Sequence, residues 1–312
     1  MNKGLLIYNQ AAGSLDEGLV PRLISALGDV DATPIQELGD LSDLPARARS
    51  LGISWIAVAG GDGTVESVAA ALIGQGIPLG VITAGTYNNF ARSLDLPLDP
   101  IEACRVIRNE QPSPIDAGFA NGKPFFECAG IGLDAALFPF GEQIKSGNFA
   151  RWFTMLRRAY FYKPRRFTLT LDRPLRQALQ RGAPHENHRF AKKLTHSERW
   201  NLTTSALMIS VSNGPLFGMN FAIAPDARMD DGLLTISIFR RYNKLELWWH
   251  FLSIAQGRRA YSPKTITLRV AKMSISAQRP AHVHLDGSPA KIWPLEVECR
   301  PAALEVFRPP KA

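Results

Sequence analysis

Residues 54–65 read SWIAVAGGDGTV, and this stretch decides the fold predicted for the chain. Its first part, 54–59, is apolar enough for a buried strand, and Gly60 and Gly61 end that strand. A helix is expected to follow from about Thr64 to Ile73. Glycines at such a junction let the backbone approach a ligand closely, and a helix N-terminus attracts phosphate. The stretch therefore predicts a phosphate-binding turn, and the alternative is a tight turn with a purely structural role.

Apolar segments alternate with helical patterns on both sides of this stretch. Strands are expected at 4–8, around Ile35 and at 78–82, and helices at 16–27, 42–51, 88–94 and 101–108, with Ser42 as an N-cap. The strands are apolar throughout, which is typical of a parallel sheet covered on both faces. Residues 1–118 are therefore predicted to form a doubly wound α/β domain.

The pattern changes after Pro112-Ser-Pro114. Strands are then expected at 125–129, 166–171, 203–212, 233–240, 265–270, 273–277 and 282–285, several of them with apolar residues at every second position. Two helices are expected, near 148–162 and 244–256. Residues 119–299 are therefore predicted to form an antiparallel β-sandwich, and the tail from 300 to 312 could return to the first domain.

Composition excludes several classes of protein. The three cysteines, Cys104, Cys128 and Cys299, are far apart, which argues against a disulfide framework and a zinc site. Lys3 precedes only a short apolar run, and no run approaches the ~18 apolar residues of a membrane span, so a soluble cytoplasmic protein is expected. The net charge of +8 attracts polyanions. A nucleic-acid role is not expected, because zinc-finger and RNA-recognition signatures are absent from the sequence.

The segment 173–199 is rich in basic residues and also contains His185, His188 and His196. These histidines lack the spacing of metal ligands, so a basic loop or an extended hairpin tip is the preferred interpretation. Such a segment could attract an anionic membrane surface.

A second glycine–threonine pair follows the apolar strand at 78–82. Residues 84–92 read AGTYNNFAR, and Gly85-Thr86 is expected to open another helix. In open α/β sheets, ligands bind outside the carboxyl ends of the strands, where both glycine motifs are placed.

Together these motifs resemble the diacylglycerol kinase catalytic-domain superfamily, which includes bacterial diacylglycerol, undecaprenol and phosphatidylglycerol kinases and the ceramide and sphingosine kinases. The stretches AGGDGTV and GTYNNFARSLDLP carry the resemblance. It continues in the same order through PIDAG (114–118), SNGPLFG (212–218), APDA (224–227), DDGL (230–233) and LDG (285–287). The resemblance implies a phosphofructokinase- and NAD kinase-like first domain, a C-terminal β-sandwich, and ATP in the crevice between them.

The resemblance also implies roles for individual residues. The loop from Asn9 to Gly13 would border ATP, Thr86 would add a contact, and the residues expected to cradle its phosphates are Gly60, Gly61, Asp62, Gly63, Thr64 and Ser67. A structural Mg²⁺, or Ca²⁺, would be held by the Asp231 carboxylate and the backbone oxygens of Arg228 and Leu233, because hard cations prefer oxygen ligands. Asp286 is the first choice for the catalytic base and Asp62 the second.

Three acids of the family pattern are replaced, by Ser67, Asn89 and Ser288. The resemblance predicts an ATP-dependent lipid kinase. The replaced acids favour the alternative, a catalytically weak member of the family that binds lipid or nucleotide. An NAD kinase is disfavoured by the GTYNNFAR motif. The lipid stays open among diacylglycerol, phosphatidylglycerol, a polyprenol and a sphingoid base.

The acceptor's acyl chains stay in the bilayer, so the enzyme is expected to dock peripherally at the inner face of the membrane. Two aromatic clusters could lie at that interface or pack in the core, and they are Trp248, Trp249 and Phe251, and Trp152, Phe153 and Tyr160 to Tyr162 beside Arg157 and Arg158. A homodimer stays open.

Overall fold

The computed structural model describes residues 3–13, 15, 18–133, 135, 161–180, 189–218, 220–240, 242–243, 245–246, 249 and 264–310. The chain divides into two compact units. Unit 1 comprises Met1–Ala117, Met229–Asp231 and Pro301–Ala312, and unit 2 comprises Gly118–Arg228 and Gly232–Arg300. The sequence placed the boundary after residue 118 and did not foresee that the short segment Met229–Asp231 belongs to unit 1.

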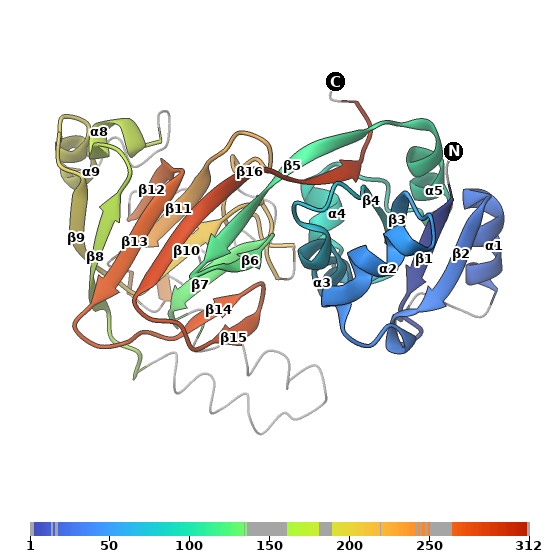
Figure 1. Ribbon diagram of the computed structural model, residues 1–312. Helices are drawn as coiled ribbons and strands as arrows, with labels where there is room; N and C mark the ends of the chain where they lie inside the picture. Colours follow the sequence, from blue (N-terminus) through green and yellow to red (C-terminus); the bar gives the residue numbers. More distant parts are fainter. Residues whose placement is uncertain are drawn as a thin grey trace. The chain divides into compact units, whose positions relative to one another are not determined.

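Unit 1 is built on a parallel sheet in the order β2-β1-β3-β4-β16 (Figure 1). The strands are β1 (Gly4–Tyr8), β2 (Val30–Pro34), β3 (Trp55–Gly60), β4 (Leu79–Thr83) and the end of β16 (Leu295–Phe307). Strand β3 is buried along its whole length, as its apolar sequence predicts. The last strand arrives from the far end of the chain, where Val306 pairs with Leu79 and the Phe307 ring packs edge-on against Trp55.

Helices cover both faces of this sheet. They are α1 (Leu19–Leu27), α2 (Leu44–Ser50), α3 (Asp62–Leu72), α4 (Asn89–Ser93) and α5 (Pro100–Asn109), with 3-10 turns η1 (Ile35–Glu37) and η2 (Leu41–Asp43). Helix α1 packs against α5, and both share a core with one face of the sheet through Leu23, Ile107 and Ala57. Helix α3 packs against β3 and α2. The doubly wound α/β prediction is confirmed.

Two local predictions in unit 1 are wrong. Ile35 does not lie in a strand, because β2 ends at Pro34 and Ile35 begins the turn η1. Ser42 is not the N-cap of α2: it lies inside η2, where its own N–H donates to the Asp40 carboxylate at 2.9 Å. Asp40 therefore caps η2, and α2 begins at Leu44 with a proline in its first turn, where the missing N–H costs nothing.

Unit 2 is an antiparallel β-sandwich. One of its sheets has the order β12-β11-β10-β7-β14-β15, and the other runs from β16 through β13 and β8 to β9, with β5 paired to β16 and β6. The strands are β5 (Pro112–Ala120), β6 (Lys123–Phe125), β7 (Cys128–Gly132), β8 (Arg165–Leu171), β9 (Asn201–Ala206), β10 (Met208–Ser212), β11 (Leu234–Phe239), β12 (Thr265–Val270), β13 (Lys272–Ala277), β14 (Val283–Leu285) and β15 (Ser288–Ala290). Phe167, Leu169 and Ile275 of one sheet share a core with Ile209, Ile236 and Leu268 of the other.

Two predicted strands in unit 2 are each divided into two. The strand expected at 203–212 breaks at Leu207, because β9 belongs to one sheet and β10 to the other. The strand expected at 125–129 breaks at Phe126–Glu127, where the backbone N–H groups donate to a side chain instead of a neighbouring strand. Strand β5 was missed, because the prolines that open it were taken for a domain boundary.

The basic segment is not a simple loop. Its described residues contain helix α8 (Leu175–Ala178) and helix α9 (Arg189–Leu194). Arg176 forms an ion pair with Glu198, and the side chains of Lys192 and Lys193 are exposed. Residues 181–188 and most of the helices expected at 148–162 and 244–256 lie outside the described residues.

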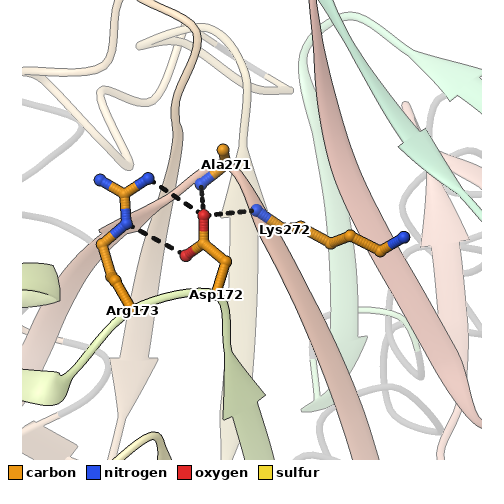
Figure 2. A network of polar contacts seen from close by, with 4 residues as sticks. All are labelled: Asp172, Arg173, Ala271 and Lys272. Atoms are coloured by element: carbon orange, nitrogen blue, oxygen red, sulfur yellow. Dashed lines mark hydrogen bonds and ion pairs between the residues drawn. The ribbon is translucent and has the colours of Figure 1, made fainter.

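A polar network joins the end of β8 to the β12–β13 turn (Figure 2). The Asp172 carboxylate accepts the backbone N–H groups of Ala271 and Lys272, at 3.0 and 3.3 Å. Arg173 donates to both oxygens of the same carboxylate, at 3.1 and 3.0 Å. Asp172 therefore fixes the corner at which the chain passes from β12 to β13.

Candidate functional site

The first group of predicted site residues lies at the carboxyl ends of β1 and β3. The sheet order is β2-β1-β3-β4, so the strand order reverses between β1 and β3. Open α/β sheets bind ligands at this point, outside the carboxyl ends of the two strands. Here Asn9 Nδ2 donates to Thr64 Oγ1 at 2.8 Å, and Asn9 Oδ1 accepts the N–H of Ala11 at 3.0 Å. The structure thus joins two residues that the sequence placed beside ATP.

The two glycine motifs meet back to back. A Cβ added to Gly85 would lie 2.5 Å from the Cα of Gly61, and a Cβ added to Gly60 would lie 2.8 Å from the Cβ of Thr64. Only glycine allows such a close approach of the two turns. A Cβ added to Gly63, in contrast, would meet nothing within 4 Å. Gly60, Gly61 and Gly85 therefore serve packing, while Gly63 borders open space at the start of α3.

Asp62 ties the two motifs together. Helix α3 begins at Asp62, two residues before the predicted start at Thr64, and Gly61 is its N-cap. The Asp62 carboxylate accepts the N–H of Phe90, in the first turn of α4, at 3.1 Å. Burial raises the pKa of this carboxyl, and hydrogen bonds from the Phe90, Asn88 and Asn89 backbones oppose that rise. This geometry gives Asp62 a structural role in joining the two glycine motifs.

The remaining predicted nucleotide ligands lie around this centre. Ser67 Oγ donates to the Gly63 carbonyl at 2.7 Å, so its hydroxyl bonds its own helix. Thr86 is exposed in the bend before α4, and Gly13 is exposed in the turn after β1. Asn89, which stands where the family pattern has an acid, is 2% exposed.

The Asp286 carboxylate forms the centre of a second group of residues, in unit 2. Asp286 and Gly287 are the two turn residues between β14 and β15, with φ values of 43° and 83°. Asp-Gly is a favoured pair for such a turn, because both residues tolerate the left-handed region. Oδ1 accepts the N–H groups of Glu127 and Cys128 at 2.9 and 2.8 Å, and Oδ2 accepts that of Phe126 at 2.7 Å. The carboxylate is therefore held by three backbone donors from the β6–β7 corner.

Burial dominates the electrostatics of Asp286. It raises the pKa of this carboxyl to about 6, although the three backbone N–H groups and the nearby His284 favour the ionised form. A carboxylate offers about four lone-pair positions. Oδ1 uses two for backbone donors and Oδ2 uses one, so Oδ2 keeps one position with which to accept a proton.

Other motif residues surround this turn. The N–H groups of Asn213 and Gly214 donate to the Glu127 carbonyl at 3.0 and 3.3 Å, which joins the SNG motif to the same corner. His284 Nδ1 accepts the Gly287 N–H at 3.2 Å, and its ring stacks on Phe217 with centroids 5.0 Å apart. Sequence reasoning missed His284, which lies in β14 two residues before Asp286. Ser288 is exposed on β15.

The predicted metal ligands lie in one short stretch of chain. Asp230 forms an ion pair with Arg308, with Oδ2 and Nη1 3.2 Å apart, and both side chains are mostly buried. Gly232, with a φ of 71°, turns the chain directly after Asp231. The set of one carboxylate and two carbonyls, from Asp231, Arg228 and Leu233, is an all-oxygen donor set of the kind that suits Mg²⁺ or Ca²⁺. Within the described residues, no group of three or more His, Cys, Asp or Glu side chains could hold a metal ion.

Two family models match this chain, one in each half. Residues 3–120 match the model of the diacylglycerol kinase catalytic domain. Residues 132–308 match that of the YegS C-terminal NAD kinase beta sandwich-like domain. The two models together match most of the chain, which belongs to the lipid kinase family made of these two domains.

Relatives with names are distant in sequence identity, but the similarity extends over most of the chain. A Pseudomonas aeruginosa protein named "Probable lipid kinase YegS-like" is 28% identical over 276 residues, 88% of this chain and 82% of that protein. A Mycobacterium tuberculosis protein named diacylglycerol kinase is 27% identical over 307 residues, 96% of this chain and 91% of that protein. The chain spans 55% of an uncharacterized Synechocystis protein to which it is 27% identical over 264 residues, 83% of this chain.

Solved structures share the fold. A crystal structure of a diacylglycerol kinase from Bacillus anthracis matches 99% of this chain and 97% of its own chain, with a TM-score of 0.71 and 22% identity. Among the helices in the described part of the chain, none combines the length and the apolar character that a membrane crossing requires.

Proposed function

We propose that this chain transfers the γ-phosphate of ATP to the hydroxyl group of a lipid. Membership of a kinase family whose relatives carry lipid kinase names supports the reaction class. The observation that carries the proposal is the Asp286 carboxylate, which is fixed by three backbone donors and has a pKa raised to about 6. A base whose pKa lies close to the working pH is well suited to accept the proton of an attacking hydroxyl.

The nucleotide is assigned to the carboxyl ends of β1 and β3. Asn9 and Thr64 would orient it through their side chains, and the open space at Gly63 leaves room for phosphate against the start of α3. Phosphoryl transfer depends mainly on positioning and on neutralising charge. ATP bound with Mg²⁺ supplies the phosphoryl group and a counter-charge. The Asp231, Arg228 and Leu233 oxygens are proposed to hold a second, structural divalent ion.

Docking at the surface of a membrane is part of the proposal. Trp249 is 68% exposed and Phe161 is 69% exposed. Large aromatic side chains in such exposed positions favour an interfacial role over core packing. The exposed Lys192 and Lys193 would add attraction to an anionic leaflet, of about 1 kcal/mol for each charge near the surface.

The direct test is incubation of the purified chain with γ-labelled ATP, Mg²⁺ and mixed micelles of diacylglycerol, phosphatidylglycerol, a polyprenol or a sphingoid base. We expect label in at least one lipid and its loss in Asp286→Ala. The matched control is Asp172→Ala, which removes another carboxylate that binds backbone N–H groups in the same unit and should keep the labelling. Nucleotide binding without labelling of any lipid would favour the catalytically weak alternative, with Ser67, Asn89 and Ser288 as the reason.

A further inference from the structure

A chain of side-chain hydrogen bonds crosses the carboxyl ends of three neighbouring strands in unit 1. Gln36 lies in η1 just after β2, Asn9 follows β1, and Thr64 lies in the first turn of α3, after β3. Gln36 Nε2 donates to Asn9 Oδ1 at 3.0 Å, and Asn9 Nδ2 donates to Thr64 Oγ1 at 2.8 Å. The sequence motifs place Asn9 and Thr64 beside ATP, whereas Gln36 belongs to none of them.

The backbone fixes which way the Asn9 amide points. The N–H of Ala11 can only donate, and its nitrogen lies 3.0 Å from Asn9 Oδ1, so this side-chain atom must be the oxygen. The main chain of Asn9 is also held, because its N–H donates to the Ala59 carbonyl at 3.0 Å and its carbonyl accepts the Ala12 N–H at 2.9 Å. The amide nitrogen therefore faces Thr64, and the Thr64 hydroxyl accepts in the bond between them.

Both acceptor positions of Asn9 Oδ1 are in use. An amide oxygen has two lone pairs, and Oδ1 accepts from the Ala11 backbone and from Gln36. Gln36 must present its amide nitrogen to Asn9, because its oxygen could not donate. The Gln36 side chain is exposed, so this bond competes with water and contributes orientation more than stability.

Two hydrogens in this chain of bonds have no acceptor within the residues that the structure describes. They are the second N–H of the Asn9 amide and the hydroxyl hydrogen of Thr64. A Cβ added to Gly63 would meet nothing within 4 Å, so the start of α3 beside Thr64 is open to a ligand. Two donors without an acceptor suit a group that only accepts. A phosphate oxygen is such a group, and a helix N-terminus favours its charge.

We propose that Gln36 is a positioning residue for the phosphates of the nucleotide, because it fixes the Asn9 amide so that Asn9 and Thr64 both donate toward them. The inference rests on the proposed function for the place of the nucleotide. Hydrogen bonds in a chain polarise one another, so the bond from Gln36 also strengthens the donors further along. Gln36 acts through Asn9, and its effect is confined to the phosphates and does not extend to the adenosine part of ATP.

The test separates the phosphates from the nucleoside. Inorganic tripolyphosphate, ATP and adenosine are titrated by calorimetry into the wild-type chain and into Gln36→Met, which keeps the length of the side chain, stays neutral and loses the donor. Salt at about 0.15 M screens the general attraction of a basic chain for polyanions. We expect the Kd values for tripolyphosphate and ATP to rise about three- to tenfold, as loss of one hydrogen bond implies, and that for adenosine to stay within about twofold. The melting temperature should not change, because Gln36 is exposed.

Gln36→Glu is the stronger variant, because a carboxylate accepts and does not donate. It favours the opposite orientation of the Asn9 amide, in which Thr64 donates to Asn9 and is lost to the ligand. We expect the Kd for tripolyphosphate to rise more than tenfold, and the neutral Gln36→Met shows that charge repulsion is not the only cause. The matched control is Gln75→Met, which removes another exposed glutamine of unit 1, one whose Oε1 accepts from Arg49 at 2.9 Å. It should leave all three Kd values within about twofold of wild type.

Three results would overturn the proposal. They are binding of tripolyphosphate to Gln36→Met as tight as to the wild type, an equal loss of affinity for adenosine and tripolyphosphate, and a wild-type chain that does not bind tripolyphosphate. Binding of tripolyphosphate that depends on Gln36, without phosphorylation of any lipid, would uphold this role and count against the proposed kinase reaction alone.

Discussion

Replacing Asp286 by asparagine tests the proposed base through stability as well as activity. The substitution keeps the shape of the side chain and removes its charge. The Asn amide oxygen can replace Oδ1 and accept the Glu127 and Cys128 N–H groups. The amide nitrogen then faces the Phe126 N–H, which donates to Oδ2 in the wild type. Two donors therefore meet, and the loss of this hydrogen bond should cost about 1–3 kcal/mol.

The pKa of Asp286 adds a term that depends on pH. Its folded-state pKa is raised from 3.8 to about 6. The folded state therefore binds more protons than the unfolded state between these values, and the wild type loses stability as pH rises through this window. The shift of about two units corresponds to at most about 3 kcal/mol, present as a cost above pH 6. The Asn variant does not have this cost, so it should be less stable than wild type near pH 4 and recover relative to it by pH 7.

Urea denaturation of both proteins at closely spaced pH values between 3.5 and 7.5 measures this difference. The expected curve of ΔΔG against pH has its slope between the two pKa values and is flat on either side. Kinetics on the same samples should show kcat lowered by roughly 10²–10⁴-fold in the variant, as expected on loss of a general base. A ΔΔG that does not vary with pH would refute the raised pKa, and a kcat close to wild type would refute the role as base.

Four further substitutions follow from the packing. Gly63→Ala should stabilise α3 by about 0.5–1 kcal/mol, because its Cβ would meet open space, and it should weaken ATP binding. Gly85→Ala should lower the free energy of unfolding by at least about 1–3 kcal/mol, because its Cβ would lie 2.5 Å from the Gly61 backbone. Thermal melting with and without ATP separates the two variants, and equal effects would contradict the assignment. Thr64→Val removes the acceptor of the 2.8 Å hydrogen bond from Asn9 and should raise the Kd for ATP about tenfold, measured by calorimetry. The control is Thr33→Val on β2, which should leave the Kd for ATP unchanged. Asp172→Ala should lower the free energy of unfolding by about 1–3 kcal/mol, seen in urea denaturation, through loss of the Ala271 and Lys272 bonds, and a change below about 0.5 kcal/mol would show that the corner does not depend on them.

The glycine motifs were predictable because their signal is local. An apolar run followed by Gly60 and Gly61 specifies a buried strand and a tight turn, and both are present. The Asp286 site was predictable only in part. Its Asp-Gly pair indicates a turn, but the three N–H donors come from residues about 160 positions earlier in the chain, and pairing at that distance leaves no pattern in the sequence.

Strand β5 and the buried polar side chains on one face of the six-stranded sheet were missed for different reasons. Pro112 and Pro114 read as punctuation, yet they open a nine-residue strand whose buried part begins at Ile115. Thr235 and Ser237 alternate with apolar residues, a pattern that usually means a solvent-facing side. Whether such a face is exposed or buried depends on what packs over it, which local periodicity cannot specify.

The central claim, that this chain phosphorylates a lipid with ATP, is tested most directly by the stoichiometry of its products. ADP is measured by chromatography, and the phosphorus of the lipid phase by ³¹P NMR, after one reaction with a lipid that accepts label. The account predicts one new lipid phosphomonoester for each ADP formed, with both lost in Asp286→Asn. ADP released with inorganic phosphate and an unmodified lipid would contradict it.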